Sequence, residues 1–145
     1  GTKVPAVLPQ RITPALVSVL RRHRPLWISV HFTHPAELTP AAAAACRRLV
    51  DAGIPLMNQT VLLRGVNDDL QTLTRLNEEL LLLGVKPYYL HQGDLAAGTA
   101  HLRSTVARGR NILRQMSGRV PGYAIPLFMF DPPGGGGKMP LGPAG

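Results

Sequence analysis

The sequence is poor in cysteine, and this shortage excludes several kinds of site. Cys46 is the single cysteine, so the chain cannot form an internal disulfide. One thiol also cannot bind an iron–sulfur cluster, which needs several thiolate ligands. Cys46 lies in an alanine-rich stretch with helical spacing, where we expect a small buried residue. His31 and His34 have no partner cysteine and no HExxH pattern, so we expect no metal site within the chain.

Aromatic and acidic residues are also scarce. Aromatic residues make up 5% of the chain, and 8 acidic residues face 16 basic ones, which gives a formal charge of +8. Such a charge favours phosphate-rich partners, but stacking of bases requires aromatic side chains among the basic ones, and few lie there. Arg21, Arg22 and Arg24 lie at a predicted helix end, where cations complement the helix dipole. We therefore expect no nucleic-acid partner, and keep a non-catalytic basic binding fragment as an alternative.

Long apolar runs are missing as well. Charged residues interrupt every apolar run well before the length of a membrane span, and no basic-then-apolar leader opens the chain. We expect no membrane partner and a cytoplasmic location; a homo-oligomer is compatible with the sequence. The hydrophobic content of 45% is enough for a core. The chain starts with Gly1 rather than methionine, and we expect a fragment of a longer protein.

Strand-like and helix-like segments alternate along the chain. Thr13-Pro14, Thr39-Pro40 and Ser104-Thr105 are helix-start signals, and Asn67 to Asp69 supply another cap. The expected helices cover residues 14–22, 41–50, 70–83 and 105–116, and the expected extended segments cover residues 4–8, 27–32, 56–63, 86–90 and 123–130. Repeated strand–helix units predict an α/β fold with a parallel sheet, either open or curled into part of a barrel.

Ligands of parallel α/β sheets bind beyond the carboxyl ends of the strands, so the residues there are candidates for a site. Polar residues lie beside or after four of the expected strands: His31, His34, Asn58, Gln59, His91, Gln92, Asp94 and Asp131. Taken singly, each has an ordinary interpretation. A histidine at a strand end is often only hydrogen-bonded, and an aspartate before a proline is often a turn residue.

The Gly/Pro-rich tail is the most informative segment. Asp131 and Lys138 are separated by two prolines and four glycines, which allow the backbone to adopt positive φ and approach a ligand. A lysine held in this way is a candidate Schiff-base nucleophile or anion ligand, although a simple linker remains an alternative. A nucleotide-binding loop is excluded because Pro132 and Met139 replace its first glycine and its hydroxyl residue. No Gly-x-Ser-x-Gly motif of a serine hydrolase occurs.

Taken together, several segments resemble the lysine 2,3-aminomutases, which are radical S-adenosylmethionine enzymes that also use pyridoxal phosphate. The matching segments are VLPQRIT (7–13), the stretch from Trp27 to HFTHP (31–35), DAGIP (51–55), NQTVLLRGVND (58–68), KPYYL (86–90) and DPPGGGGKMP (131–140). They occur in the family's order over the whole chain.

The resemblance implies that residues 1–131 form the carboxyl-terminal half of a radical S-adenosylmethionine partial (β/α) barrel. Residues 132–145 would be the segment that carries the pyridoxal phosphate lysine. It also implies a [4Fe-4S] cluster, but its Cys-x3-Cys-x2-Cys loop would lie upstream, as would the arginines that bind the cofactor phosphate. This chain alone would then be inactive.

Site residues follow from the resemblance position by position. Lys138 matches the lysine that forms the Schiff base with pyridoxal phosphate. Asp94 and Asp131 match the carboxylates that bind the side-chain ammonium of the substrate lysine, and a cation removed from water needs such countercharge. His31 and Gln59 match residues beside S-adenosylmethionine.

The implied reaction is the conversion of L-lysine to β-lysine by radical 2,3-amino migration. Glutamate-using relatives have other residues at the positions of Asp94 and Asp131, so the two aspartates favour lysine. The related family that makes β-lysine for elongation factor P is an alternative, against which the intact PGGGGK segment and Asp94 argue. His91 replaces a common tyrosine, and Asp69 replaces a zinc-binding cysteine of some members, so we expect no structural zinc.

Overall fold

The computed structural model describes residues 1–142, and its main helices begin where the capping signals predict. In each of these helices a capping side chain accepts a hydrogen bond from the backbone amide of the third helical residue. The caps are the hydroxyls of Thr13, Thr39 and Thr105 and the carboxylate of Asp69. These helices are α2 (Pro14–Arg21), α3 (Pro40–Asp51), α4 (Leu70–Leu82) and α5 (Val106–Met116). Their starts and ends agree with the expected ranges to within about two residues, as is usual for helix ends.

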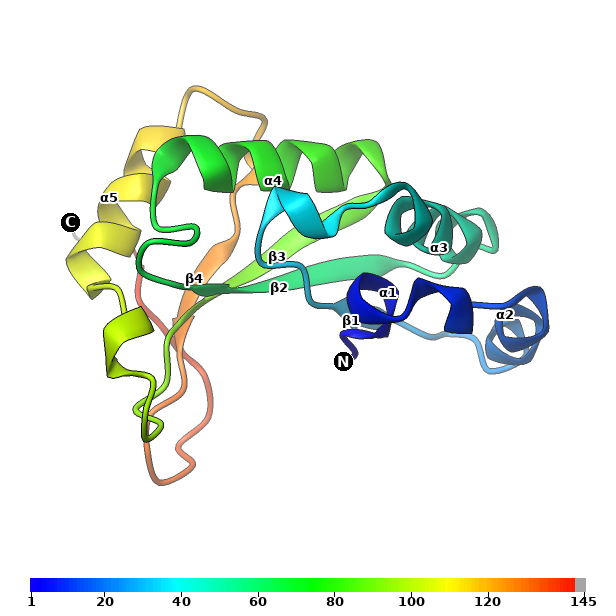
Figure 1. Cartoon of the computed structure of the whole chain (residues 1–145), viewed down its shortest axis with the longest axis horizontal. Helices are drawn as coiled ribbons and strands as arrows, with labels where there is room; N and C mark the ends of the chain where they lie inside the picture. Colours follow the sequence, from blue (N-terminus) through cyan, green and yellow to red (C-terminus); the bar gives the residue numbers. More distant parts are fainter. Residues whose placement is uncertain (143–145) are drawn as a thin grey trace.

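A five-stranded sheet forms the centre of the structure, which confirms the α/β class. Its strands are β1 (Ile28–Val30), β2 (Leu56–Leu62), β3 (Val85–Gln92), β4 (Leu127–Phe130) and β5 (Met139–Pro140), and they lie side by side in chain order. Neighbouring strands from β1 to β4 are parallel, and β5 is antiparallel to β4. Figure 1 shows α3, α4 and α5 on the same side of this sheet. Parallel strands in chain order with right-handed crossovers place their helices on one side.

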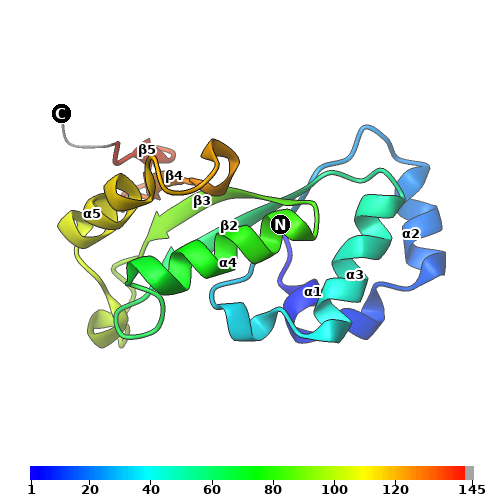
Figure 2. The ribbon, with the colours of Figure 1, turned by 90° about the horizontal axis from the view of Figure 1, so that it is seen from above.

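The core lies between this sheet and the helices. Alternate residues of β2 are buried, so Leu56, Asn58, Thr60 and Leu62 face the helices, whereas Gln59 lies on the opposite face. One cluster joins α3 and α4 to β1 and β2, and a second joins α5 to β4. Figure 2 shows α3 and α5 at opposite ends of the molecule, with α4 between them.

Two of the expected extended segments are wrong in part or in whole. Val4–Val7 forms the short helix α1, because Pro5 fits a first helical turn and the amide of Leu8 bonds the Val4 carbonyl. The strand expected over residues 123–130 begins only at Leu127, after Pro126, which lacks an amide donor. The remaining short helices are of the 3-10 type: Pro9–Arg11, Pro35–Glu37, Ala100–Leu102 and Gly122–Ala124.

The glycine-rich tail turns back and pairs with the sheet. Gly134, Gly135 and Gly137 have φ values of 98°, 81° and 82°, a region that residues with a side chain rarely adopt. After this turn Met139 pairs with Phe130, so the described part of the tail is joined to the sheet by the short strand β5 and is not a free linker. The proposed boundary at residue 132 stays a prediction, and residues 143–145 of that segment lie outside the described residues.

Within residues 1–142, none of the helices has the length and apolar composition that a membrane crossing requires.

Candidate functional site

Four of the five predicted site residues line one small cavity beside β2, β3 and β4. The cavity has a volume of about 180 Å³ and is lined by Gln59, Val61, His91, Gln92, Asp94, Asp131 and Lys138. Gln59 comes from β2, Asp94 follows β3, Asp131 follows β4, and Lys138 precedes β5. Parallel strands bring their carboxyl ends to one edge, which explains why residues distant in sequence meet there.

Lys138 and Asp131 form an ion pair in this cavity. The Lys138 Nζ lies 3.0 Å and 3.2 Å from the two carboxylate oxygens of Asp131. Both side chains are about two-fifths exposed, at 39% and 42%. The glycine turn between them produces this contact, because it reverses the chain direction over seven residues. The sequence placed both residues at the site but did not predict that they pair.

His91 is a second neighbour of Asp131. Its Nδ1 lies 3.4 Å from the Asp131 Oδ2, and its side chain is 11% exposed. The ring packs edge-on against Tyr89, with 5.5 Å between ring centroids. Burial and the positive charge of Lys138 lower the pKa of His91 below its usual range, against the opposing effect of Asp131 and Asp94. His91 is therefore neutral at neutral pH.

Asp94 reaches the cavity from the loop that follows β3. Its backbone carbonyl accepts hydrogen bonds from the guanidinium of Arg103, at 3.2 Å and 3.0 Å from Nε and one terminal nitrogen. This contact fixes the backbone of the loop and leaves the carboxylate available for a ligand.

His31 follows β1 on the same sheet edge but does not line this cavity. Its backbone carbonyl accepts a hydrogen bond from the Lys3 Nζ at 3.2 Å. Burial and the nearby charge of Lys3 lower the pKa of His31. Of the two residues predicted to lie beside S-adenosylmethionine, Gln59 therefore lines the cavity and His31 does not.

Two candidates from the strand ends have structural roles instead. Asn58 is 1% exposed on the helix-facing side of β2, where it bonds the amide and carbonyl of Phe32 at 2.8 Å and 3.0 Å. The imidazole of His34 accepts a hydrogen bond from the Ala36 amide at 3.1 Å and caps a short helix. Strand alternation predicts opposite faces for Asn58 and Gln59, so the sequence contained the signal that separates them.

Other reactive side chains lie away from the cavity. Lys86 donates to the carbonyls of Pro87 and Tyr123, and Lys3 pairs with Glu37 at 2.6 Å. Cys46 is fully buried, as expected, and burial raises the pKa of its thiol to about 11. Among residues 1–142, no group of histidine, cysteine, aspartate or glutamate side chains is arranged to bind a metal ion.

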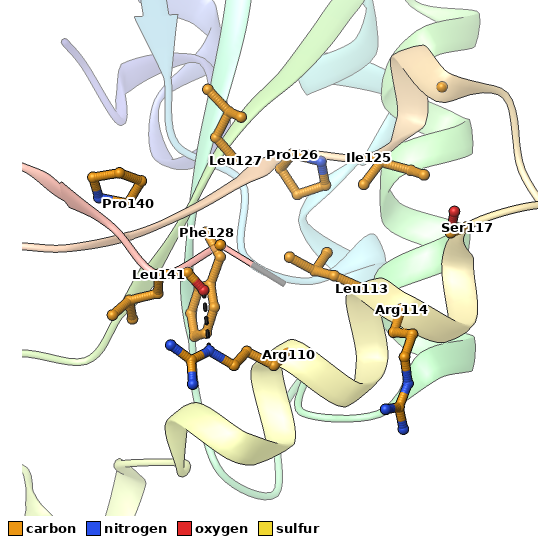
Figure 3. Close-up of a pocket in the computed structure, with 12 residues that line it drawn as sticks. Arg110, Leu113, Arg114, Ser117, Ile125, Pro126, Leu127, Phe128, Pro140 and Leu141 are labelled. Carbon is orange, nitrogen blue, oxygen red and sulfur yellow. Dashed lines mark hydrogen bonds between the residues drawn. The ribbon is translucent and has the colours of Figure 1, made fainter. Parts of the chain in front are cut away.

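A larger cavity of about 500 Å³ lies between α5 and the strands β4 and β5 (Figure 3). Its walls are mainly apolar, and none of the predicted site residues lines it. Arg110 bonds the Leu141 carbonyl at 3.2 Å, and in Figure 3 Arg114 extends away from Phe128. The two arginines therefore do not converge on a common anion, and the smaller cavity remains the candidate site.

The sequence is similar to those of known aminomutases. Over 143 residues, which is 99% of this chain, the sequence is 50% identical to an L-lysine 2,3-aminomutase of Fusobacterium nucleatum subsp. nucleatum and 48% identical to one of Clostridium subterminale. The resemblance to the lysine 2,3-aminomutases is confirmed. A glutamate 2,3-aminomutase of Clostridioides difficile is 43% identical over the same length. No protein-family model matches the chain.

The chain spans about a third of the length of these aminomutases, 34% in each of the three. The catalytic activity of the relatives thus belongs to proteins about three times as long as this chain.

Proposed function

We propose that this chain is part of a longer L-lysine 2,3-aminomutase that converts L-lysine to β-lysine. The observation that carries the proposal is the pairing of Lys138 with Asp131 in a cavity that Asp94 and Gln59 also line. An amine nucleophile and two carboxylates in one cavity match the needs of a cofactor aldehyde and a cationic substrate. The similarity to lysine 2,3-aminomutases over 99% of the chain supports it.

The residues present fit pyridoxal phosphate at its aldehyde end. Lys138 is the one lysine of the three in the sequence that lines the cavity, and its ammonium is partly exposed. The glycine turn before it gives the side chain freedom to approach and leave a ligand. Pyridoxal phosphate, when bound, supplies an aldehyde for amines and a ring that delocalises electrons. No arginine lines the cavity, so the phosphate would be bound by residues outside this chain.

His31 and Gln59 would orient S-adenosylmethionine from the same sheet edge. The iron–sulfur cluster does not fit this chain, because Cys46 is buried with a raised pKa and is the sole cysteine. Cluster ligands would come from another part of the longer protein.

The charge of the cavity favours lysine over glutamate as substrate. Asp94 and Asp131 attract the distal ammonium of lysine and repel the distal carboxylate of glutamate. In the structure the ammonium of Lys138 pairs with Asp131 at 3.0 Å, and this contact supports the proposal that the carboxylate binds the primary ammonium of the substrate.

The sheet also suits the proposed partial barrel. Its four parallel strands follow chain order with the helices on one side, as in a singly wound barrel (Figure 1). Gln59 and Asp131 then lie on the opposite side or at the strand ends, where barrel enzymes bind their ligands.

Borohydride trapping tests the proposal. In the longer protein loaded with pyridoxal phosphate, reduction followed by peptide mapping should label Lys138, and Lys138→Ala should remove the Schiff-base absorption. Lys86→Ala is the matched control and should keep the absorption, because the Lys86 ammonium bonds two carbonyls elsewhere. A label on Lys86 or Lys3 instead of Lys138 would refute the assignment.

A further inference from the structure

Asp131 has two side-chain partners among the described residues, and the proposed function requires one of them to leave. Lys138 holds both carboxylate oxygens, at 3.0 Å and 3.2 Å. When Lys138 turns to the cofactor, His91 is the partner that remains, at 3.4 Å. Asp131 itself is followed by Pro132 and the glycine turn, so its backbone alone holds the carboxylate poorly in place.

The geometry of His91 suits it for holding Asp131. His91 lies opposite Met129 in the β3–β4 register, and Asp131 follows Met129 by two residues on the same face. The ring is largely buried and packs against Tyr89, so its position is fixed. His91 therefore reaches across the strand pair to a carboxylate that lies between the end of β4 and the glycine turn.

The tautomer of His91 follows from its surroundings. The Nδ1 lies 3.4 Å from a carboxylate oxygen of Asp131, which favours the tautomer with the proton on Nδ1 and Nε2 as an unprotonated acceptor. Nε2 is buried and has no partner in the described part of the chain. In the opposite tautomer, Nε2 would be a buried donor without an acceptor, and the lone pair of Nδ1 would repel the carboxylate. That tautomer therefore has the higher free energy of the two.

We propose that His91 is a positioning residue that keeps Asp131 aimed at the distal ammonium of the substrate once Lys138 has left it. This inference rests on the proposed function. The neutral imidazole donates to one oxygen of Asp131 through Nδ1 and leaves the other oxygen free for the ligand. The substrate ammonium then replaces the positive charge that Lys138 supplies in the resting structure.

The affinity for lysine should therefore depend on pH, and the charges around His91 determine whether it rises or falls. The titratable groups that act on His91 are Lys138, Asp131, Asp94 and His31, from four different segments of the chain. A bound ammonium, like that of Lys138, disfavours protonation of His91. By linkage, protonation of His91 disfavours binding of the ammonium, so affinity for lysine falls as the pH falls through the lowered pKa of His91.

Equilibrium binding tests the role apart from turnover. Calorimetric titration with L-lysine, in the longer protein without S-adenosylmethionine, would be run between about pH 5 and pH 8, where histidines titrate. His91→Leu should bind lysine about tenfold to a hundredfold more weakly at neutral pH, as expected for a lost hydrogen bond to a charged group. His91→Asn keeps an N–H donor near the Nδ1 position and should restore most of the affinity. The His91→Asn variant should also show no fall in affinity for lysine at low pH, because asparagine does not titrate there.

Norleucine, which lacks the distal ammonium, separates the possible outcomes. It should bind the wild type and both His91 variants alike. If His91→Leu binds lysine as tightly as the wild type, or if His91→Asn keeps the wild-type pH dependence, the role of His91 is refuted. If the wild type binds norleucine as tightly as lysine, the proposed substrate fails instead.

Discussion

At the scale of single residues, Asp131 connects the parts of the candidate site. Its carboxylate bonds Lys138 and lies beside His91, whereas among the described residues the side chain of Asp94 forms no ion pair with either. The two aspartates therefore have unequal roles, although both are proposed to bind the same ammonium. Asp131 also affects the lysine that would hold the cofactor, and Asp94 does not.

We predict that Asp94→Asn and Asp131→Asn are non-additive in the longer protein. Either remaining carboxylate compensates in part, but the double variant leaves a desolvated cation without countercharge. Its kcat/KM for lysine should fall by about a thousandfold, far below either single variant. Steady-state kinetics with lysine measures this effect, and the Schiff-base absorption should change in Asp131→Asn alone.

Asp51→Asn is the matched control, because Asp51 is an exposed carboxylate at the end of α3. It should leave the kinetics unchanged. Wild-type turnover of lysine by both single variants would show that Asp94 and Asp131 are only turn residues.

At the scale of elements, a glycine sets the distance between α5 and the sheet. A Cβ at Gly109 would lie 2.5 Å and 2.7 Å from two ring carbons of Phe128 in β4, and 3.0 Å from Leu62 in β2. Gly109 and Phe128 are both buried in the cluster that joins α5 to the sheet. The absence of a side chain thus allows the helix to pack closely over the strands that lead to Asp131.

We predict that Gly109→Ala destabilises the protein despite the higher helix propensity of alanine. The propensity gain is about 1 kcal/mol, whereas forcing a methyl group against a buried ring costs about 1 to 3 kcal/mol. Chemical denaturation measures the net loss. The double variant Gly109→Ala with Phe128→Leu, which makes room for the methyl group, should recover part of it.

Gly118 provides a comparison without a steric clash. It follows α5 with a φ of 78°, and a Cβ there would meet no atom within 4 Å. Alanine at residue 118 should therefore show only the backbone cost of the left-handed region, about 1 kcal/mol. If Gly109→Ala instead stabilises the protein by the propensity gain of about 1 kcal/mol, the packing argument is wrong.

At the scale of the whole molecule, the sheet has large apolar side chains exposed along it. Trp27, Leu127 and Met139 are 64%, 57% and 53% exposed, and they lie beside β1, in β4 and in β5. A backbone bridge from Thr2 to Val30 covers part of the β1 edge. Parallel sheets are normally covered on both faces, and here the described helices α3, α4 and α5 cover one (Figure 1).

We predict that the 145-residue chain expressed alone has no aminomutase turnover, even with the cofactors supplied. One buried cysteine cannot ligate a cluster that needs three thiolates. The exposed strand edges should also make the isolated chain aggregate or remain partly unfolded. Light scattering and a turnover assay measure both effects, and measured turnover by this chain would overturn the proposed dependence on a longer protein.

Local sequence signals predicted most of the helices and strands and most of the residues that line the site. Thr39 and Asp69 predicted helix starts because a cap depends on residues within one turn. The motif around Lys138 predicted the site lysine for a similar reason, since it is continuous in sequence. The segment Val4–Val7 was one exception, because an apolar segment of four residues fits a strand or a helix equally well, and the late start of β4 at Leu127 was another.

Only the tertiary structure decided which side chains touch. Three contacts depend on the register of neighbouring strands and helices. They are the ion pair of Lys138 with Asp131, the approach of His91 to that carboxylate, and the close packing of Gly109 on Phe128. Register is set by packing across the sheet, which no local window of sequence contains. The sequence by itself therefore determined which residues gather at the strand ends, and the fold decided how they pair.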